Sequence, residues 1–206
     1  MLIYTMTNDL IAGILAGGKS RRYGKNKCWE KYKGKYLIEW VIENTLNFTE
    51  NIYIIAKEKE KFLFLGFPVI EDIYPEFSPL SGILSIFPHI KKWLLLLACD
   101  IPFFKREVLE FMWGNKEDGK ACVIETNEGL QPFLAFYPKE VFPFWKESYE
   151  KGERRLQKIL EVIPKKVIKE EEIKKFDPSL LSLININYQK DLAKVKEILN
   201  GSGEKF

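Results

Sequence analysis

The sequence predicts a single α/β domain in which helices cover both faces of a mixed, mostly parallel sheet, a three-layer α/β/α arrangement of Rossmann-like type. Short apolar segments alternate with segments of helical spacing along most of the 206 residues, which favours parallel strands joined by helices. Residues 93–98 are apolar without alternation, which indicates a central strand buried on both faces. No repeat or low-complexity linker divides the chain, so we expect one domain over residues 1–206.

The remaining elements are predicted from local patterns. Helices are expected where apolar residues recur at helical spacing or where proline and glycine mark an end; these are residues 36–46, 79–87, 105–113, 139–151, a helix opened by residues 152–155, and 189–199. Strands are expected where short apolar runs lie between polar segments; these are residues 10–15, 51–56, 68–72, 121–125, 131–137, 165–168 and 180–186. A turn at residues 127–129 predicts that the strands on either side of it pair as a hairpin.

Composition narrows the class of protein. The chain is 46% hydrophobic and 14% aromatic, enough for a substantial core. A net charge of +3, from 32 basic and 29 acidic residues, does not predict nucleic acid as the main partner. The apolar runs are too short to span a membrane, and the first residues lack the pattern of a signal peptide, so we expect a cytoplasmic protein with no membrane partner.

The cysteines are too scattered to predict a metal site. Cys28, Cys99 and Cys122 form no C-x-x-C pair, and His89 is the single histidine. We therefore expect neither a zinc site nor a disulfide, but three free thiols of the kind usual in a reducing cytoplasm. Cys99 is expected to be a small buried filler.

The stretch that follows the first strand is rich in glycine and in positive charge. Residues 17–27 hold Gly17, Gly18 and Gly24 among several lysines and arginines. Glycine lets backbone N–H groups approach a ligand closely, and successive N–H groups form a nest that binds anions. The loop is therefore expected to bind a polyphosphate.

One interpretation of this stretch is a P-loop. Residues 13–20 match the pattern G-x-x-x-x-G-K-S letter for letter, and Asp100 after an apolar strand resembles a magnesium carboxylate of that class. However, Gly13 lies amid the apolar residues 10–15, so it would be inside the strand and not at the start of the loop. A P-loop phosphotransferase is therefore kept as the less favoured alternative.

The second half of the stretch supports another interpretation. Gly17, Gly18, Ser20, Arg22, Gly24 and Lys27 satisfy G-G-x-S-x-R-x-G-x-x-K. Further short elements follow in order, namely Gly34-Lys35-Tyr36-Leu37, Asp72 before Pro79-Leu80-Ser81-Gly82, Cys99-Asp100-Ile101-Pro102, Gln131-Pro132-Phe133-Leu134, Gly152-Glu153-Arg154-Arg155 and Ile184-Asn185-Ile186-Asn187. Together they resemble the nucleotidyltransferases of the nucleotide-diphospho-sugar transferase fold, and among them the molybdenum cofactor guanylyltransferases. Asn26, Tyr36 and Lys57 depart from the family's usual aspartate, proline and asparagine.

The resemblance implies a reaction and its substrates. It implies that GMP is transferred from GTP to the terminal phosphate of molybdenum-bearing molybdopterin, with Mg²⁺ as cofactor and pyrophosphate as leaving group. The nucleotide would bind in about residues 1–114 and the acceptor in about residues 115–200. Other proteins of molybdenum cofactor biosynthesis, or molybdoenzyme chaperones, would be candidate protein partners.

For the nucleotide half, the resemblance, together with the chemistry of the side chains, implies roles for a few residues. Arg22 and Lys27 would neutralise the phosphates and act in catalysis, and the backbone from Leu15 through Ala16 and Gly17 to Gly18 would contact the nucleotide. Asp100 would hold the metal, with helix N-capping as its structural alternative. Asp72 would accept from the guanine N1–H and exocyclic amine, with turn capping as its alternative.

The acceptor half carries weaker signals. Arg154 would bind the acceptor's phosphate, although residues 153–155 also suit the N-terminus of a helix. Asn185 and Asn187 are two apart on an expected strand, so their amides would face one side and orient the acceptor. Asn187 could instead cap the following helix.

Three other functions remain open from the sequence. A related enzyme could use CTP, or a sugar phosphate or methylerythritol phosphate as acceptor. A P-loop phosphotransferase would transfer the terminal phosphoryl group of the nucleotide and would release no pyrophosphate. A non-enzymatic module that binds nucleotide or carries pterin would need the basic loop but not Asp100.

Overall fold

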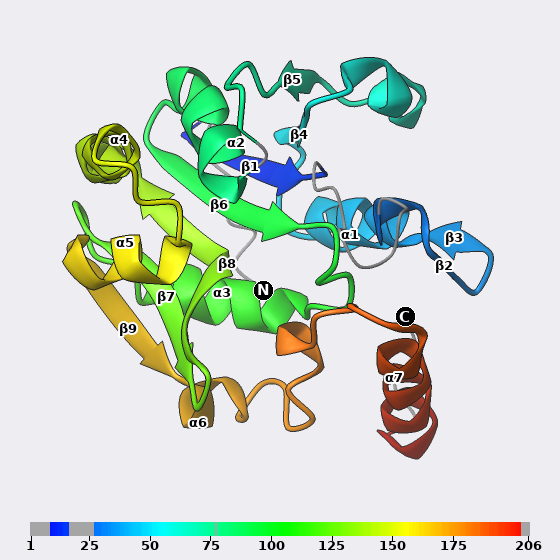
Figure 1. Cartoon of the computed structure of the whole chain (residues 1–206). Helices are drawn as coiled ribbons and strands as arrows, with labels where there is room; N and C mark the ends of the chain where they lie inside the picture. The colour runs from blue at the N-terminus through cyan, green and yellow to red at the C-terminus, as the bar shows by residue number, and fades with distance from the viewer. Residues whose placement is uncertain (1–8, 17–26, 77, 203–206) are drawn as a thin grey trace.

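The computed structural model describes residues 9–16, 27–76 and 78–202 (Figure 1). Within these residues, seven strands form one sheet in the order β5-β4-β1-β6-β8-β7-β9. Strand β8 is antiparallel to both of its neighbours, β6 and β7. All other neighbouring strands are parallel. The strands are β1 (Leu10–Leu15), β4 (Ile52–Ala56), β5 (Val69–Glu71), β6 (Trp93–Ala98), β7 (Ala121–Thr126), β8 (Gly129–Pro138) and β9 (Lys165–Lys169). The predicted mixed, mostly parallel sheet is confirmed.

The two central strands are buried on both faces, as their uniform apolar character predicts. Every residue of β1 and β6 is buried. Successive side chains point to opposite faces, so Leu95 and Leu97 belong to one core cluster, while Leu94 and Leu96 belong to the other. The sheet is therefore the middle of three layers.

Helices cover each face of the sheet (Figure 1). One core cluster is built with α1 (Leu37–Leu46) and α3 (Arg106–Gly114). The opposite cluster is built with α2 (Pro79–Ile86), α4 (Phe142–Glu150) and α5 (Leu156–Val162). Residues at the predicted helical spacing, such as Ile38, Val41 and Ile42 of α1, are the buried ones.

Helix α2 packs unusually close to β1, and two glycines make this possible. A Cβ built on Gly13 would lie 2.6 Å from Ile86 Cδ1, and one on Gly82 would lie 2.5 Å from Leu15 Cδ2. Ser78 caps the helix by accepting from the Ser81 N–H at 3.2 Å, and Pro79 occupies the first turn. Gly13 thus lies within β1, where it allows close packing. The P-loop alternative would instead place this glycine at the start of the loop after the strand.

A third core cluster seats the C-terminal helix α7 (Gln189–Ser202). Val195 and Leu199 of this helix pack with Trp40 of α1 and with Tyr32 of β2 (Lys31–Tyr32), which pairs with β3 (Lys35–Tyr36). Figure 1 shows α7 apart from the helices on the sheet faces. This packing fixes the segment that leads into α7.

The predicted strand at residues 180–186 is wrong. Leu181–Leu183 forms a 3-10 turn, η5, and residues 184–187 continue in an extended chain that pairs with no strand of the described sheet. The turn forms because the Ser182 N–H donates to the buried Asp177 carboxylate at 2.7 Å and Leu181 is held in the third cluster. The apolar run is therefore explained by core packing and not by strand pairing.

Several short elements were not predicted. They are the β2–β3 hairpin, α6 (Glu170–Ile173) and the 3-10 turns η1 (Lys27–Trp29), η2 (Lys59–Leu65) and η3 (Phe87–His89), whereas η4 (Lys139–Val141) lies within the helix predicted at residues 139–151. Elements this short carry too few residues for a period to be visible. Among the helices of the described residues, none is long and apolar enough to cross a membrane.

Candidate active site

Four parallel strands place polar residues at one edge of the sheet. Because β5, β4, β1 and β6 are neighbours and run in the same direction, their carboxyl ends meet there. Asp72 follows β5, Lys57 follows β4, Ala16 follows β1, and Asp100 lies two residues beyond β6. This edge is the expected position of a ligand site in an open α/β sheet.

Lys27, Asp100 and Asn187 come together at the β6 end of this edge. Lys27 Nζ lies 3.3 Å from Asp100 Oδ2 and also donates to the amide oxygen of Asn187. The side chains of Lys27 and Asp100 are 25% and 24% exposed, so both can still be reached by a ligand. Residues from the start, middle and end of the chain thus form one polar cluster.

The backbone holds this cluster in place. Asp100 accepts at its carbonyl from the Ile186 N–H at 2.7 Å, and Ile186 is buried in the third cluster. One carboxylate oxygen of Asp191 accepts from the Asn187 and Tyr188 N–H groups at 2.8 and 2.7 Å. The Asp191 carboxylate, in the first turn of α7, therefore holds the backbone that carries Asn187, and the Asn187 side chain contacts Lys27.

Burial raises the pKa of the Asp100 carboxyl, and the charge and hydrogen bond of Lys27 oppose that rise. A carboxylate in this setting is stabilised by any further cation that reaches it. Its donor set suits magnesium, which commonly takes one or two carboxylates and completes its shell with phosphate oxygens and water. Among the described residues, no group of three or more His, Cys, Asp or Glu side chains that could hold a metal ion is found.

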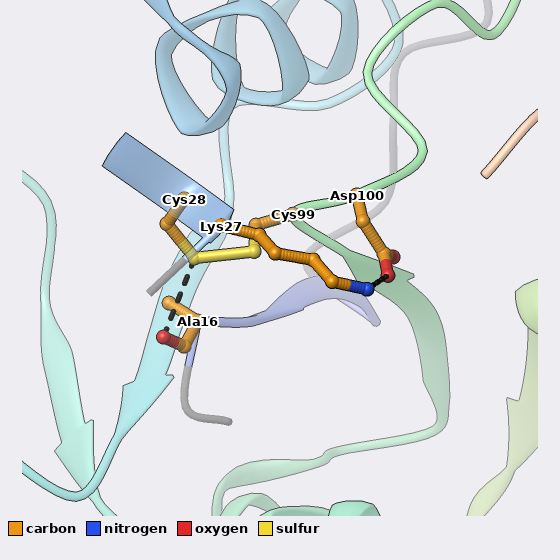
Figure 2. Close-up of a disulfide and its surroundings, with 5 residues drawn as sticks. All are labelled: Ala16, Lys27, Cys28, Cys99 and Asp100. Atoms are coloured by element: carbon orange, nitrogen blue, oxygen red, sulfur yellow. Dashed lines mark hydrogen bonds and ion pairs between the residues drawn. A yellow bond between two sulfur atoms is a disulfide. The ribbon is translucent and has the colours of Figure 1, made fainter. Parts of the chain in front are cut away.

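The prediction that all cysteines are free thiols is wrong for two of them. Cys28 and Cys99 form a disulfide with a Cα–Cα distance of 5.4 Å (Figure 2). Cys28 is fully buried and Cys99 is 8% exposed, within the cluster that also contains Ala16. Cys122 is free and buried, and desolvation raises its pKa to about 12. The two partners are 71 residues apart, a spacing that carries no sequence signal.

Asp72 forms the centre of a second cluster, at the β5 end of the edge. Lys57 Nζ lies 3.2 Å from Asp72 Oδ1, and Ser81 donates to Oδ2 at 3.0 Å. The Tyr74 N–H donates to Oδ1 at 3.2 Å, which is the turn interaction that the capping alternative expects. Both roles stay open for Asp72, because a carboxylate can accept more than one hydrogen bond on each oxygen.

Arg154 belongs to a third cluster. Its Nη2 lies 3.0 Å from Glu76 Oε1, and its guanidinium carbon lies 3.9 Å from the ring centroid of Tyr149. The Tyr149 hydroxyl donates to the other oxygen of Glu76. These hydrogen bonds, from Tyr149 first and Arg154 second, lower the pKa of Glu76 to about 2. The guanidinium of Arg154 is therefore paired with the carboxylate of Glu76, a residue of the segment that leads from Asp72 to α2.

The other predicted site residues are placed as follows. Leu15 and Ala16 lie at the end of β1, where the Ala16 N–H donates to the Ile55 carbonyl at 2.9 Å and the Leu15 carbonyl accepts from Cys99. Asn185 lies in the extended segment before Ile186 and is partly exposed. Arg22, Gly17 and Gly18 lie outside the described residues. The structure joins Asn187 to Lys27 and Arg154 to Glu76, so the predicted acceptor residues do not form one contact group within the described chain.

Sequence reasoning missed Lys57, Glu76 and Tyr149 as partners of predicted site residues. Lys57 directly follows a strand whose end meets the same edge, so its position was a usable signal. Glu76 and Tyr149 carry no such signal, because a carboxylate in a loop and a tyrosine on a helix are common surface residues.

Comparison with known proteins agrees with this architecture. A family model described as the MobA-like NTP transferase domain matches residues 12–170. A protein of Clostridium perfringens named a probable molybdenum cofactor guanylyltransferase is 35% identical, over 91% of this chain and 98% of its own length. A protein of the same name from Aquifex aeolicus is 30% identical, over 91% of this chain and 90% of its own. The crystal structure of molybdopterin-guanine dinucleotide biosynthesis protein A from Archaeoglobus fulgidus superposes with a TM-score of 0.78 at 27% identity, covering 92% of this chain and 98% of that one.

Proposed function

The chain belongs to the MobA-like NTP transferase family, and on this premise we propose that it is a molybdenum cofactor guanylyltransferase. It transfers GMP from GTP to the terminal phosphate of molybdenum-bearing molybdopterin. The products are pyrophosphate and the guanine dinucleotide form of the cofactor. Relatives that carry this name match nearly the whole chain, which supports the same activity here.

The observation that carries the proposal is the cluster of Lys27, Asp100 and Asn187 at the carboxyl edge of the sheet. A lysine paired with a carboxylate offers a cation for phosphate and a ligand for a divalent metal in the same place. Asn187 adds a neutral amide that can orient a polar substrate. A module that only binds nucleotide would not need Asp100 beside the lysine.

In the proposed mechanism these residues position the substrates and stabilise charge. An oxygen of the acceptor's phosphate attacks the α-phosphorus of GTP, and the bond from that phosphorus to the pyrophosphate oxygen breaks. Lys27, together with Arg22, stabilises negative charge on the phosphates. Because the attacking phosphate is already anionic, no general base is required.

We propose that Asp100 holds the divalent cation and that this cation is Mg²⁺. The bound metal supplies neutralisation of charge on the transferred group and on the leaving pyrophosphate. The ammonium of Lys27 lies 3.3 Å from Asp100, so the carboxylate has a cationic partner.

The proposed division of labour follows the order of the strands. Residues up to about 114 bind the nucleotide, with the guanine at Asp72 and the phosphates near Lys27. Residues from about 115 to 200 bind the acceptor through Arg154, Asn185 and Asn187. Proteins that make or receive the molybdenum cofactor are the protein partners we propose.

Nucleotide choice is tested by thermal unfolding with GTP, CTP, ATP or UTP, each with Mg²⁺. A ligand that binds only the folded state stabilises it by RT ln(1 + [L]/Kd), so we expect the largest rise in Tm with GTP. Equal shifts with all four nucleotides would refute the guanylyl assignment. In a second assay, molybdenum-bearing molybdopterin should trigger release of pyrophosphate from GTP. Release of orthophosphate instead would refute nucleotidyl transfer.

A further inference from the structure

Each cysteine of the disulfide is the sequence neighbour of one charged residue of the proposed active site. Lys27 directly precedes Cys28, and Asp100 directly follows Cys99. Figure 2 shows the Lys27 side chain extending alongside the disulfide to reach Asp100. One covalent link therefore joins the two backbone positions from which the Lys27–Asp100 ion pair is built.

The segment that carries Lys27 is short and is attached to the rest of the fold at both ends. Its turn η1 is only three residues long, Lys27–Trp29, and a 3-10 turn of this length is weak by itself. Trp29 anchors its far end by stacking on Phe62 with ring centroids 4.8 Å apart. The near end, beside Lys27, is attached through Cys28 to the end of β6.

Asp100 is fixed more firmly. The Cys99 N–H donates to the Leu15 carbonyl at 3.2 Å, and Ile186 donates to the Asp100 carbonyl. The disulfide thus connects a rigid strand end, which carries the proposed metal ligand, to a short turn, which carries the proposed phosphate-binding lysine. Loss of the link would affect the position of Lys27 more than that of Asp100.

We propose that the Cys28–Cys99 disulfide is a positioning element of the active site, and that its reduction by a dithiol lowers GTP binding and guanylyl transfer. The effect on transfer rests on the proposed function. The effect on nucleotide binding does not require that the acceptor is molybdopterin.

Reduction is a balanced thiol–disulfide exchange. One thiolate of the dithiol attacks a sulfur of the disulfide, the S–S bond breaks, and a mixed disulfide forms. The second thiolate of the reductant then attacks its own sulfur in that mixed disulfide and releases the remaining cysteine. The two cysteine sulfurs gain two electrons and two protons in total, and the dithiol becomes a cyclic disulfide.

The reduced Cys28 thiol already has an acceptor within reach. Its sulfur lies 3.3 Å from the Ala16 carbonyl oxygen, so a thiol at this position can donate to the end of β1. The reduced cysteine can therefore stay buried, while the covalent connection to β6 is lost. We accordingly expect a folded protein with a less precisely placed Lys27 and not an unfolded chain.

Cys122 provides a matched control. It is a buried cysteine of the same core cluster, it lies on β7, and it takes no part in the disulfide. A Cys122→Ala variant keeps the disulfide and should respond to reductant as the parent does. A Cys28→Ala/Cys99→Ala variant lacks the link permanently and does not depend on access of a reductant to a buried bond.

The test begins with the redox state. Alkylation in denaturant, followed by intact mass, should add one label to the protein prepared without reductant and three after dithiothreitol. Three labels without reductant would overturn the proposal. Circular dichroism at the assay temperature establishes that each form compared is folded.

Two readouts then separate positioning from simple stabilisation. The first is binding of Mn²⁺–GTP, followed by electron paramagnetic resonance of the metal. The second is the turnover of GTP to pyrophosphate at saturating substrates. We expect reduction or the double alanine variant to lower affinity or turnover about tenfold to a hundredfold, as displacement of a reacting group by about 1 Å does. Reoxidation of the parent protein should restore its affinity and turnover. Dithiothreitol should not change the affinity or turnover of the double alanine variant.

Failure of the positioning role and failure of the proposed function give different results in these assays. If both affinity and turnover of the folded, reduced protein stay within about twofold of the oxidised protein, the positioning role is wrong and the disulfide only stabilises the fold. If Mn²⁺–GTP binding weakens on reduction but neither form transfers GMP, the positioning role stands and the proposed function fails.

Discussion

Lys27 Nζ lies 3.3 Å from Asp100 Oδ2, although 73 residues separate the two in sequence. Each group would be a poor element of an active site without the other, because a partly buried carboxylate needs a cation and a lone lysine in a loop is solvated. Together they form an ion pair at the carboxyl edge of the sheet, where we propose that Asp100 binds the metal and Lys27 binds the phosphates.

Replacing Asp100 should abolish most of the activity. We expect Asp100→Asn to lower turnover on the order of 10²-fold or more at saturating Mg²⁺, because it removes the proposed metal ligand while keeping the size of the side chain. Pyrophosphate release measures the effect. The control is Asp118→Asn, since Asp118 is 78% exposed and pairs only with Lys92 at 3.5 Å among its described contacts. Turnover within about threefold of the parent would remove Asp100 from the mechanism.

Asp72 should decide the choice of base. Guanine presents two N–H donors to a carboxylate, whereas xanthine presents one donor and a carbonyl. Asp72→Asn should therefore lower kcat/KM for GTP about tenfold to a hundredfold, as expected for hydrogen bonds to a charged group, and raise it for XTP. Glu71→Gln is the control, because Glu71 is the exposed neighbour on β5. An unchanged ratio of GTP to XTP in the Asp72 variant would leave Asp72 with the turn-capping role alone.

Glu76 should compete with the acceptor for Arg154. If Arg154 binds the acceptor's phosphate, then Glu76→Gln should lower the KM for the acceptor about two- to fivefold, since an exposed ion pair is worth up to about 1 kcal/mol. The KM for GTP should stay unchanged. The control is Glu153→Gln, because the Glu153 carboxylate pairs with the Arg155 guanidinium at 3.2 Å and contacts Arg154 through the Arg154 backbone N–H. The guanidinium of Arg154 donates to the backbone carbonyl of Glu153, which this variant keeps.

The pH dependence of this competition follows from the pKa of Glu76, which is lowered to about 2. A carboxyl whose pKa is lowered by folding contributes stability above its ordinary pKa, and that contribution is lost as the pH falls through the lowered value. Glu76 therefore stays ionised at every working pH, and the effect of Glu76→Gln should be constant from about pH 5 to about pH 8. An effect that disappears at about pH 5 would contradict this assignment.

Reduction of the disulfide should also lower the stability of the fold. The link closes a loop with a sequence separation of 71, and a link of this kind typically contributes about 2 to 5 kcal/mol by restricting the unfolded chain. For a chain of this size that corresponds to a fall in Tm of about 5 to 15 °C, measured by calorimetry with and without dithiothreitol. The Cys122→Ala variant should show the same fall in Tm on reduction. An equal Tm of the parent protein with and without dithiothreitol would contradict this prediction.

Much of the fold was predictable because its signals are local. The uniform apolar run at residues 93–98 predicted the doubly buried strand β6, and the turn at residues 127–129 predicted the β7–β8 hairpin. The segment at residues 180–186 misled, because an apolar run does not distinguish a strand from a turn that packs in a core cluster.

The amino-acid sequence by itself determined the fold class and the family, because the spacing of apolar residues and the order of short motifs can be read along the chain. It also predicted the edge of the sheet at which we propose the site. Only the tertiary structure decided which side chains meet. In the folded chain Cys28 forms a disulfide with Cys99, Lys27 donates a hydrogen bond to Asn187, and Arg154 forms an ion pair with Glu76. These contacts join residues 71, 160 and 78 positions apart, and their partners are set by how the packed layers bring the segments together in space, which no local pattern encodes.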